Sequence, residues 1–196
     1  MIKQIEGILK DREALKLSPS TGHTETAGVL MMLKEEEGEP FVFFIKRAED
    51  ENDPFSGNMA FPGGRKDEGI DRDVLDTAIR ETLEETGIDL REGGRLLGSL
   101  DDIWHSYSTT YHYLITPFVA LAPLNPQIVL SCEVAESVWV PLSFLRDRKN
   151  WITTTYEHKG IRQWAEGVQY RHYFIWGITG GIVQQFFSLI QCASER

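Results

Sequence analysis

One stretch of the chain places eight acidic side chains close behind a pair of glycines. It reads AFPGGRKDEGIDRDVLDTAIRETLEETGI from Ala60 to Ile88. The acids are Asp67, Glu68, Asp71, Asp73, Asp76, Glu81, Glu84 and Glu85. Carboxylates at this density repel one another, so the fold must leave them in water or bring cations to them. The stretch therefore predicts either a solvated helix face or a face that binds a metal ion.

The second half of this stretch has the pattern of a helix with a defined start and end. Asp71 or Asp73 is suited to cap its first turn, and Gly87 is suited to a left-handed cap at its end. Its apolar stripe is expected to be buried. The stripe consists of Val74, Leu75, Ala78, Ile79, Thr82 and Leu83.

Three glutamates of this helix are expected to project from one face. Glu81, Glu84 and Glu85 stand at positions i, i+3 and i+4. Their hard oxygen atoms suit Mg2+ or Mn2+, which can bind substrate phosphates and activate a water molecule. Arg80 is placed to pair with Glu84 or to orient Glu81. The alternative is a solvated face joined by pairs such as Asp76 with Arg80.

The glycine pair and two nearby arginines are candidates for contacts with phosphate. Gly63 and Gly64 permit the backbone to approach a metal ion or a phosphate closely. Arg47 and Arg65 lie close to the pair in the sequence and can bond to phosphate oxygens. Surface ion pairing is the alternative role for both arginines.

Together these residues resemble a family signature. FPGGRKDEG followed by IRETLEETGI is similar to the motif of the Nudix hydrolases, which cleave nucleoside diphosphates linked to another moiety. Six positions match it, namely Arg80, Glu81, Glu84, Glu85, Gly87 and Ile88. Thr82 replaces an aliphatic residue, and the interval from Gly64 to Arg80 is longer than usual. The early acid of the motif is therefore left open among Asp67, Glu68 and Asp71.

The resemblance implies a set of roles for the matching residues. Glu81 and Glu85 would be the principal ligands of Mg2+ or Mn2+, and the Gly64 carbonyl would complete the site. Glu84 would be a third ligand or the general base, and Arg80 would belong to the catalytic group. For the base, Glu81, Glu133 and Glu136 remain alternatives, although surface positions are favoured for the last two.

A narrower resemblance covers roughly residues 27–190. FFIKRA, SGNMAFPGG, LITPFVA and EVAESVWVPL are similar to the coenzyme A diphosphatase subgroup, which would yield 3',5'-ADP and 4'-phosphopantetheine. Asp53 departs from the subgroup, which has an arginine there, four residues before Gly57. The same chemistry on ADP-ribose, a nucleotide sugar or a dinucleotide is the alternative. A non-catalytic nucleotide-sensing module is a second alternative, although it would usually lack the motif glutamates.

The chain is expected to form one α/β (α+β) domain. The resemblance implies a Nudix fold, an αβα sandwich with a central mixed β-sheet. We expect residues 1–196 to be a single domain with an N-terminal helix and connector (1–26), the motif (60–88) and a C-terminal helix (173–192). Strands are predicted at 27–34, 40–47, 94–102, 111–121, 135–142 and 151–157, with a short turn of helix after Pro141.

Four aromatic residues precede or occupy one of these strands. They are Trp104, Tyr107, Tyr111 and Tyr113. Aromatic side chains on strands usually belong to the core, and stacking on a nucleobase is the alternative.

Charge and cysteine content limit the partners. A net charge of −10 argues against nucleic acid, whereas a small phosphorylated ligand can be bridged by a divalent cation. Two cysteines and an N-terminus without an apolar core indicate the cytoplasm. Residues 173–192 are long enough to span a bilayer, but their polar stripe predicts a helix docked on the core, with no membrane partner. The expected partner is a small-molecule nucleoside diphosphate, and a homodimer remains open.

Overall fold

A computed structural model describes residues 1–18, 23–51, 53, 55–106, 111–158 and 161–194. Its centre is a mixed eight-stranded sheet with the path β3-β2-β1-β7-β5, and β4, β6 and β8 join it at the sides. These strands are β1 (His23–Glu36), β2 (Glu39–Arg47), β3 (Met59–Ala60), β4 (Gly63–Arg65), β5 (Arg95–Ser99), β6 (Ile103–Ser106), β7 (Tyr111–Leu121) and β8 (Val134–Pro141).

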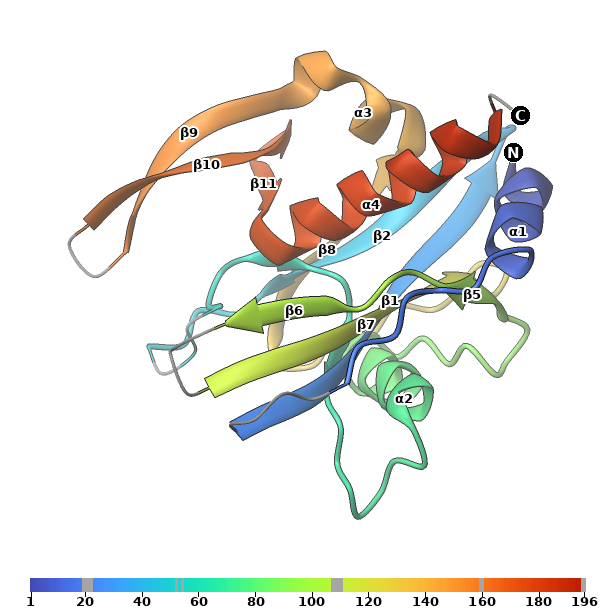
Figure 1. Ribbon diagram of the computed structural model, residues 1–196, viewed down its shortest axis with the longest axis horizontal. Coiled ribbons are helices and arrows are strands. Elements are labelled where there is room, and N and C mark those ends of the chain that lie inside the picture. The colour runs from blue at the N-terminus through green and yellow to red at the C-terminus, as the bar shows by residue number, and fades with distance from the viewer. Residues whose placement is uncertain (19–22, 52, 54, 107–110, 159–160, 195–196) are drawn as a thin grey trace.

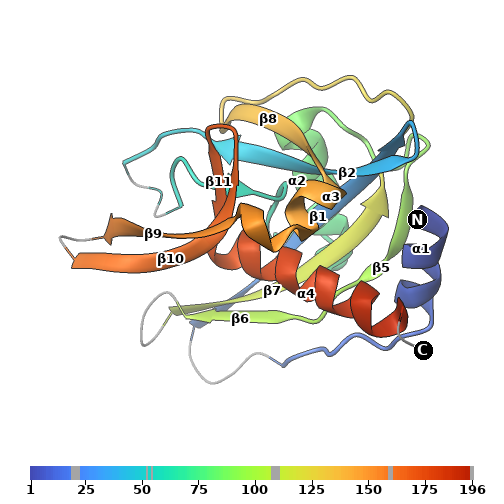
Figure 2. The same cartoon turned by 90° about the horizontal axis from the view of Figure 1, so that it is seen from above.

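Helices cover both faces of this sheet (Figures 1 and 2). One face carries α2 (Val74–Thr86), and the other carries α1 (Ile2–Lys10), α3 (Leu142–Arg146) and α4 (Gly177–Ser194). A short 3-10 helix, Arg148–Asn150, follows α3. The arrangement confirms the predicted αβα sandwich with a central mixed sheet.

The central strand supplies side chains to both cores. Along β1, Leu30 and Met32 pack toward α2, whereas Met31 and Leu33 pack toward α1 and α4. This alternation is the ordinary consequence of the two-residue period of a strand, and all four side chains are fully buried. β1 pairs antiparallel with β2 and parallel with β7. A tight turn at Glu37 and Gly38, both with positive φ, joins β1 to β2.

Helix α2 begins and ends where the sequence predicts. The side chain of Asp73 accepts the N–H of Asp76 at 2.9 Å, and Gly87 ends the helix with φ 73°. Its buried face agrees with the predicted stripe at Ala78 and Thr82 and differs at the other positions. The fully buried residues are Thr77, Ala78, Thr82, Glu85 and Thr86, while the leucines are only half-buried.

Two threonines and a glycine explain why α2 buries this face. The hydroxyls of Thr82 and Thr86 each donate to a helix carbonyl at 2.6 Å, which satisfies them inside the core. Gly28 of β1 lies under the helix, where a Cβ would stand only 2.2 Å from the carbonyl oxygen of Val74. The missing side chain allows α2 to pack directly on the strand.

A second, three-stranded sheet differs from the sequence prediction. It contains β9 (Trp151–His158), β10 (Ile161–Tyr170) and β11 (Tyr173–Trp176) in antiparallel pairs. The predicted C-terminal helix 173–192 was therefore wrong at its start, because residues 173–176 form β11. The helix begins at Gly177, whose φ of 59° lets the chain leave the strand. Strands β3, β4, β6 and β10 were not predicted.

Helix α4 packs against the sheet as predicted. Ile182, Val183 and Phe186 are buried in the core, and Ser188 and Gln191 are exposed. Among the described residues, no helix is long and apolar enough to cross a membrane.

Candidate active site

The glycine pair forms the short strand β4, which pairs with β1 beside α2. At Gly63, with φ 146°, a Cβ would meet the backbone oxygen of Gly28 at 2.2 Å, so no larger residue fits. At Gly64, a Cβ would lie 2.5 Å from the Cδ atom of Glu81. The glycine pair therefore brings the backbone directly against the acidic face of α2.

Glu85 is the most buried carboxylate of this face. Its side chain is 5% exposed, and it accepts the N–H of Gly63 at 3.0 Å. The Nη1 atom of Arg47 lies 4.0 Å from it. Burial, together with the negative charges of Glu81 and Glu133, raises the pKa of Glu85 to about 8. The site therefore holds a carboxylate that lacks full compensation from the protein.

Glu81 and Glu84 share one arginine. Nη1 of Arg80 lies 2.8 Å from Glu81 and 3.0 Å from Glu84. Burial raises the pKa of Glu81, and repulsion from Glu84 and Glu133 also raises it. Glu84 is 58% exposed, so it is the one most accessible to water.

Asp71 fixes the position of Arg80. Its carboxylate is 2% exposed and receives two bonds from the guanidinium, at 2.8 and 2.9 Å. Thr77 and the N–H of Asp67 also donate to it. The Arg80 guanidinium holds the pKa of Asp71 well below its usual range. Of the three candidate early acids, Asp71 is thus the one bonded to Arg80, while Glu68 pairs with Lys66.

The ion pair between Asp76 and Arg80, considered in the solvated-face alternative, does not form, whereas the expected contacts of Arg80 with Glu81 and Glu84 do. Asp76 bonds to Arg72, four residues before it, at 2.6 Å rather than to Arg80. The donors of Arg80 are already engaged, because Nε and Nη2 bond to Asp71 and Nη1 lies against Glu81 and Glu84.

The two later glutamates lie in different surroundings. Glu133 precedes β8 and lies close enough to raise the pKa of both Glu81 and Glu85. Glu136 instead accepts bonds from His172 at 3.0 Å and Tyr173 at 2.9 Å. These bonds lower the pKa of Glu136 to about 2. The structure therefore brings Glu133 toward the acidic face and engages Glu136 elsewhere.

The two candidate phosphate-binding arginines also separate. Arg47 ends β2 beside Glu85, and Asp53 holds its guanidinium at 2.8 Å. Asp53 is the residue that departs from the subgroup motif, and its bond to Arg47 was not predicted from the sequence. Arg65 ion-pairs with Glu25 of β1 at 3.4 Å and is 61% exposed. Only Arg47 is therefore seen in contact with the buried glutamate.

Aromatic residues gather at the ends of β6 and β7. Tyr111 and Tyr113 have ring centroids 5.3 Å apart, and Trp104 lies 5.0 Å from His112. Phe55, from the loop that contains Asp53, lies 6.2 Å from Tyr113. The tyrosines and Trp104 are half-buried, so they line a surface and do not form the core. Tyr107 lies outside the described residues.

The acidic face fits a hard divalent cation in its chemistry. Glu81, Glu84 and Glu85 offer carboxylate oxygens on one side of α2, and Gly64 offers close backbone approach. Within the described part of the chain, no three His, Cys, Asp or Glu side chains are drawn together as a closed cation cage. Glu81 and Glu84 turn toward Arg80 instead. The residues that would hold a cation are thus adjacent, and each has a second partner.

The fold and this acidic face together define a Nudix-type domain. The NUDIX domain model matches residues 22–158, and the chain belongs to the Nudix family.

Two curated relatives match parts of this chain. An uncharacterized protein of Schizosaccharomyces pombe is 39% identical over 54% of this chain and 33% of its own. The peroxisomal coenzyme A diphosphatase ndx-8 of Caenorhabditis elegans is 34% identical over 63% of this chain and 52% of its own. The chain thus spans about a third and about half of the length of these relatives.

A solved structure shows the same fold. The Ap4A hydrolase of C. elegans, in a binary complex, aligns with a TM-score of 0.51 at 19% identity. The alignment covers 61% of this chain and 81% of that one.

Proposed function

We propose that the chain is a Mg2+- or Mn2+-dependent pyrophosphohydrolase that cleaves the diphosphate of a nucleoside diphosphate linked to another moiety. The observation that carries this proposal is the buried carboxylate of Glu85, held by the Gly63 N–H beside Glu81. A buried anion with a raised pKa is costly unless a cation compensates it, and family membership makes a divalent metal the expected cation.

The residues of the site divide into three tasks. Glu81 and Glu85, with Glu84 and the Gly64 carbonyl, would hold the metal ion. Arg80 is a positioning residue, because its bonds to Asp71 fix the guanidinium that orients Glu81. When bound, the cation would neutralise phosphate charge and acidify a water molecule.

The remaining groups act on phosphate and on the proton. Arg47, oriented by Asp53, would bond to a phosphate oxygen, and Gly63 keeps Glu85 in place. Glu84 is exposed to water and Glu133 approaches the face, so either would accept the proton of the attacking water. Water adds to one phosphorus, one P–O bond of the anhydride breaks, and two phosphate monoesters leave.

Coenzyme A is the proposed substrate. The products would be 3',5'-ADP and 4'-phosphopantetheine. The motif similarity over residues 27–190 and the 34% identity with the nematode coenzyme A diphosphatase support this choice. Asp53 is compatible with it, because its carboxylate orients the guanidinium of Arg47.

A substrate panel tests the proposal. Coenzyme A, ADP-ribose, a nucleotide sugar and a dinucleotide are incubated separately with protein and Mg2+, and mass spectrometry identifies the products. We expect 3',5'-ADP and 4'-phosphopantetheine from coenzyme A only in the presence of the cation. Cleavage of another diphosphate in its place would reassign the substrate. Tight nucleotide binding without hydrolysis at any metal concentration would favour a sensing module instead.

The wider setting is proposed on the same basis. We propose that residues 1–196 act as one domain, since α1 and α4 contribute to the same core as the sheet. The partner would be a small-molecule diphosphate, with no nucleic acid and no membrane surface, and a homodimer is open to measurement. A cytoplasmic location remains a prediction, and the nematode relative is named as peroxisomal.

A further inference from the structure

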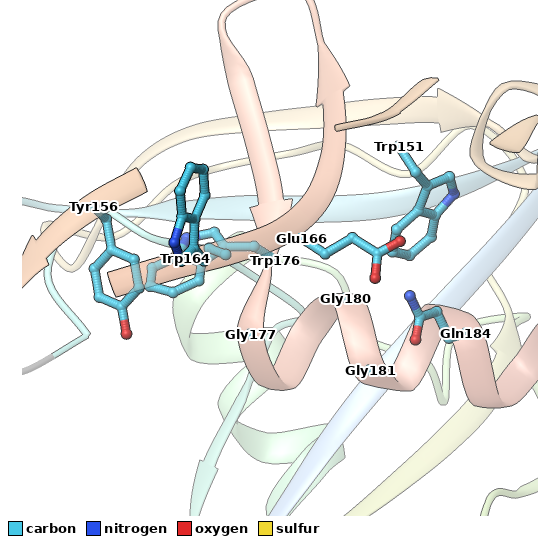
Figure 3. A pocket seen from close by; sticks show the side chains of 10 residues that line it. Trp151, Tyr156, Trp164, Glu166, Trp176, Gly177, Gly180, Gly181 and Gln184 are labelled. Atoms are coloured by element: carbon cyan, nitrogen blue, oxygen red, sulfur yellow. The ribbon is translucent and has the colours of Figure 1, made fainter. Parts of the chain in front are cut away.

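A cavity of about 320 Å3 lies between the β9–β10 hairpin and helix α4, away from the acidic face of α2 (Figure 3). Four aromatic side chains contribute to its walls, and the first turns of α4 form its floor. The lining residues used below are Trp151, Tyr156, Trp164, Glu166, Trp176 and Gln184. The proposed hydrolysis makes no use of any of them.

The aromatic walls are held in place by bonds outside the cavity. Nε1 of Trp151 donates to the carbonyl of Leu145 at 2.9 Å, and Nε1 of Trp176 donates to Asn58 at 3.2 Å. The rings of Tyr156 and Trp176 pack with centroids 4.5 Å apart. Trp164, on the rim, is 76% exposed, an unusual position for so large an apolar side chain. Fixed rings beside an open volume are typical of a ligand site.

The floor is open because α4 begins with glycines. A Cβ built at Gly181 would meet nothing within 4 Å, and at Gly180 the nearest atom would be 3.4 Å away. Glycine inside a helix costs about 1 kcal/mol relative to alanine. Packing against neighbouring residues therefore does not require glycine at either position, and the missing side chains leave the volume open.

The polar groups of the cavity select against phosphate. In Figure 3 the carboxylate of Glu166 and the amide of Gln184 point toward each other beside Trp151. Arg148 donates to Oε1 of Glu166 at 2.9 Å, which balances its charge. A carboxylate and an amide offer acceptors to N–H groups, and the indole faces offer apolar contact. The lining therefore suits an uncharged chain that carries amide N–H groups.

A second hollow adjoins this cavity and is lined in part by Gly57 and Asn58. It measures about 210 Å3, and Trp176 and Asn58 both line it. Trp176 also lines the aromatic cavity, so the two hollows meet at its ring. The carbonyl of Asn58 accepts the N–H of Arg47 at 3.0 Å, and Arg47 lies beside Glu85. Hydrogen bonds thus link Arg47, beside the acidic face, to Asn58 and Asn58 to Trp176 at the edge of the aromatic cavity.

We propose that the aromatic cavity binds the non-nucleotide end of the substrate, the amide-bearing pantetheine arm of coenzyme A. The inference rests on the proposed coenzyme A activity and adds to it the place where the arm lies. The diphosphate stays at Arg47 and the acidic face, while the arm follows the hollow past Asn58 to the indoles.

Gly181→Leu tests the assignment by filling the floor. Gly7 in α1 is the matched control, because a Cβ there also meets nothing within 4 Å and the helix lies outside the cavity. Pantetheine, which has no phosphate, is titrated while tryptophan fluorescence is followed. We expect a saturable change in wild type and in Gly7→Leu, and none in Gly181→Leu. With coenzyme A, KM should rise about tenfold in Gly181→Leu while kcat stays within about twofold.

Trp164→Ala provides a second variant. Because the Trp164 side chain is mostly exposed, its removal should leave the fold intact. It should also weaken pantetheine binding several-fold. Equal pantetheine binding by all four proteins, or no saturable binding by wild type, would overturn the cavity assignment. If wild type leaves coenzyme A intact, the proposed function fails, and the pantetheine titration alone then decides the cavity. If the wild-type protein binds pantetheine but does not cleave coenzyme A, the cavity assignment stands and coenzyme A is rejected as the substrate.

Discussion

Gly64→Ala should separate catalysis from folding at the acidic face. The backbone at Gly64 is not in the left-handed region, so alanine can adopt it. Its Cβ would nevertheless stand 2.5 Å from Cδ of Glu81 and 2.7 and 2.8 Å from its two carboxylate oxygens. Since all of these atoms belong to the end of a flexible side chain, the carboxylate will move and the strand will stay.

The size of the effect follows from that displacement. Ordinary contact begins at 3.4 Å, so the Glu81 carboxylate must retreat by about 0.9 Å. A misplacement of about 1 Å in a catalytic constellation can cost roughly 100-fold in rate, or about 2.7 kcal/mol of transition-state stabilisation. Stability should change by less than about 1 kcal/mol, because the lost Arg80 contact is partly exposed and alanine restricts the unfolded chain.

The assay measures kcat with coenzyme A and Mg2+, and urea unfolding gives the free energy of unfolding for the same preparations. Gly69→Ala is the control, since it lies in the following loop and its nearest neighbour is Asp67 Oδ1 at 3.2 Å. We expect Gly69→Ala to keep wild-type turnover. Turnover of Gly64→Ala within threefold of wild type would refute the role given to Glu81. A loss of stability above about 2 kcal/mol would refute the reasoning about the strand.

Three further predictions concern charge at the site. Asp71→Asn should cost about 2 to 3 kcal/mol at neutral pH, because it breaks a buried ion pair. The pKa of Asp71 is depressed in the fold, so this difference should shrink in urea titrations as pH falls below about 4. Because the pKa of Glu85 is raised in the fold, the metal-free protein should lose stability as pH rises from about 4 through about 8. Mg2+ should therefore raise the Tm more at pH 8 than at pH 6. An equal rise in Tm at the two pH values would contradict this prediction. Finally, Glu133→Gln should lower kcat about tenfold or more, whereas Glu136→Gln should leave it near wild type.

The sequence predicts helix α2 well because its signals are local. The cap at Asp73, the left-handed Gly87 and the spacing of the three glutamates all depend on neighbours within one or two helical turns. The burial of α2 depends on its partner strand. Gly28, far away in the sequence, lets the helix approach β1, and the threonines then replace the leucines at the contact.

The ion pairs of Arg80 with Asp71 and of Arg47 with Asp53 could not be predicted from the sequence for a similar reason. Asp71 and Arg80 are joined only after the loop 66–73 has folded back, and the sequence of that loop does not distinguish Asp71 from the candidates Asp67 and Glu68. Asp53 and Arg47 meet through a loop whose shape no periodic pattern describes. The start of α4 was predicted wrongly for another reason. A short apolar run such as residues 173–176 is compatible with a strand and with a helix.

The central claim is that a cation held by the buried glutamate face drives cleavage of the diphosphate. The most direct measurement is release of 3',5'-ADP from coenzyme A as Mg2+ is titrated, with wild type and Glu85→Gln side by side. We expect turnover to require Mg2+ in wild type and to fall by about a thousandfold in the variant. The metal-free variant should melt at the same temperature as wild type or higher, since it no longer buries an uncompensated charge. Full Mg2+-dependent turnover by a folded Glu85→Gln would contradict the claim.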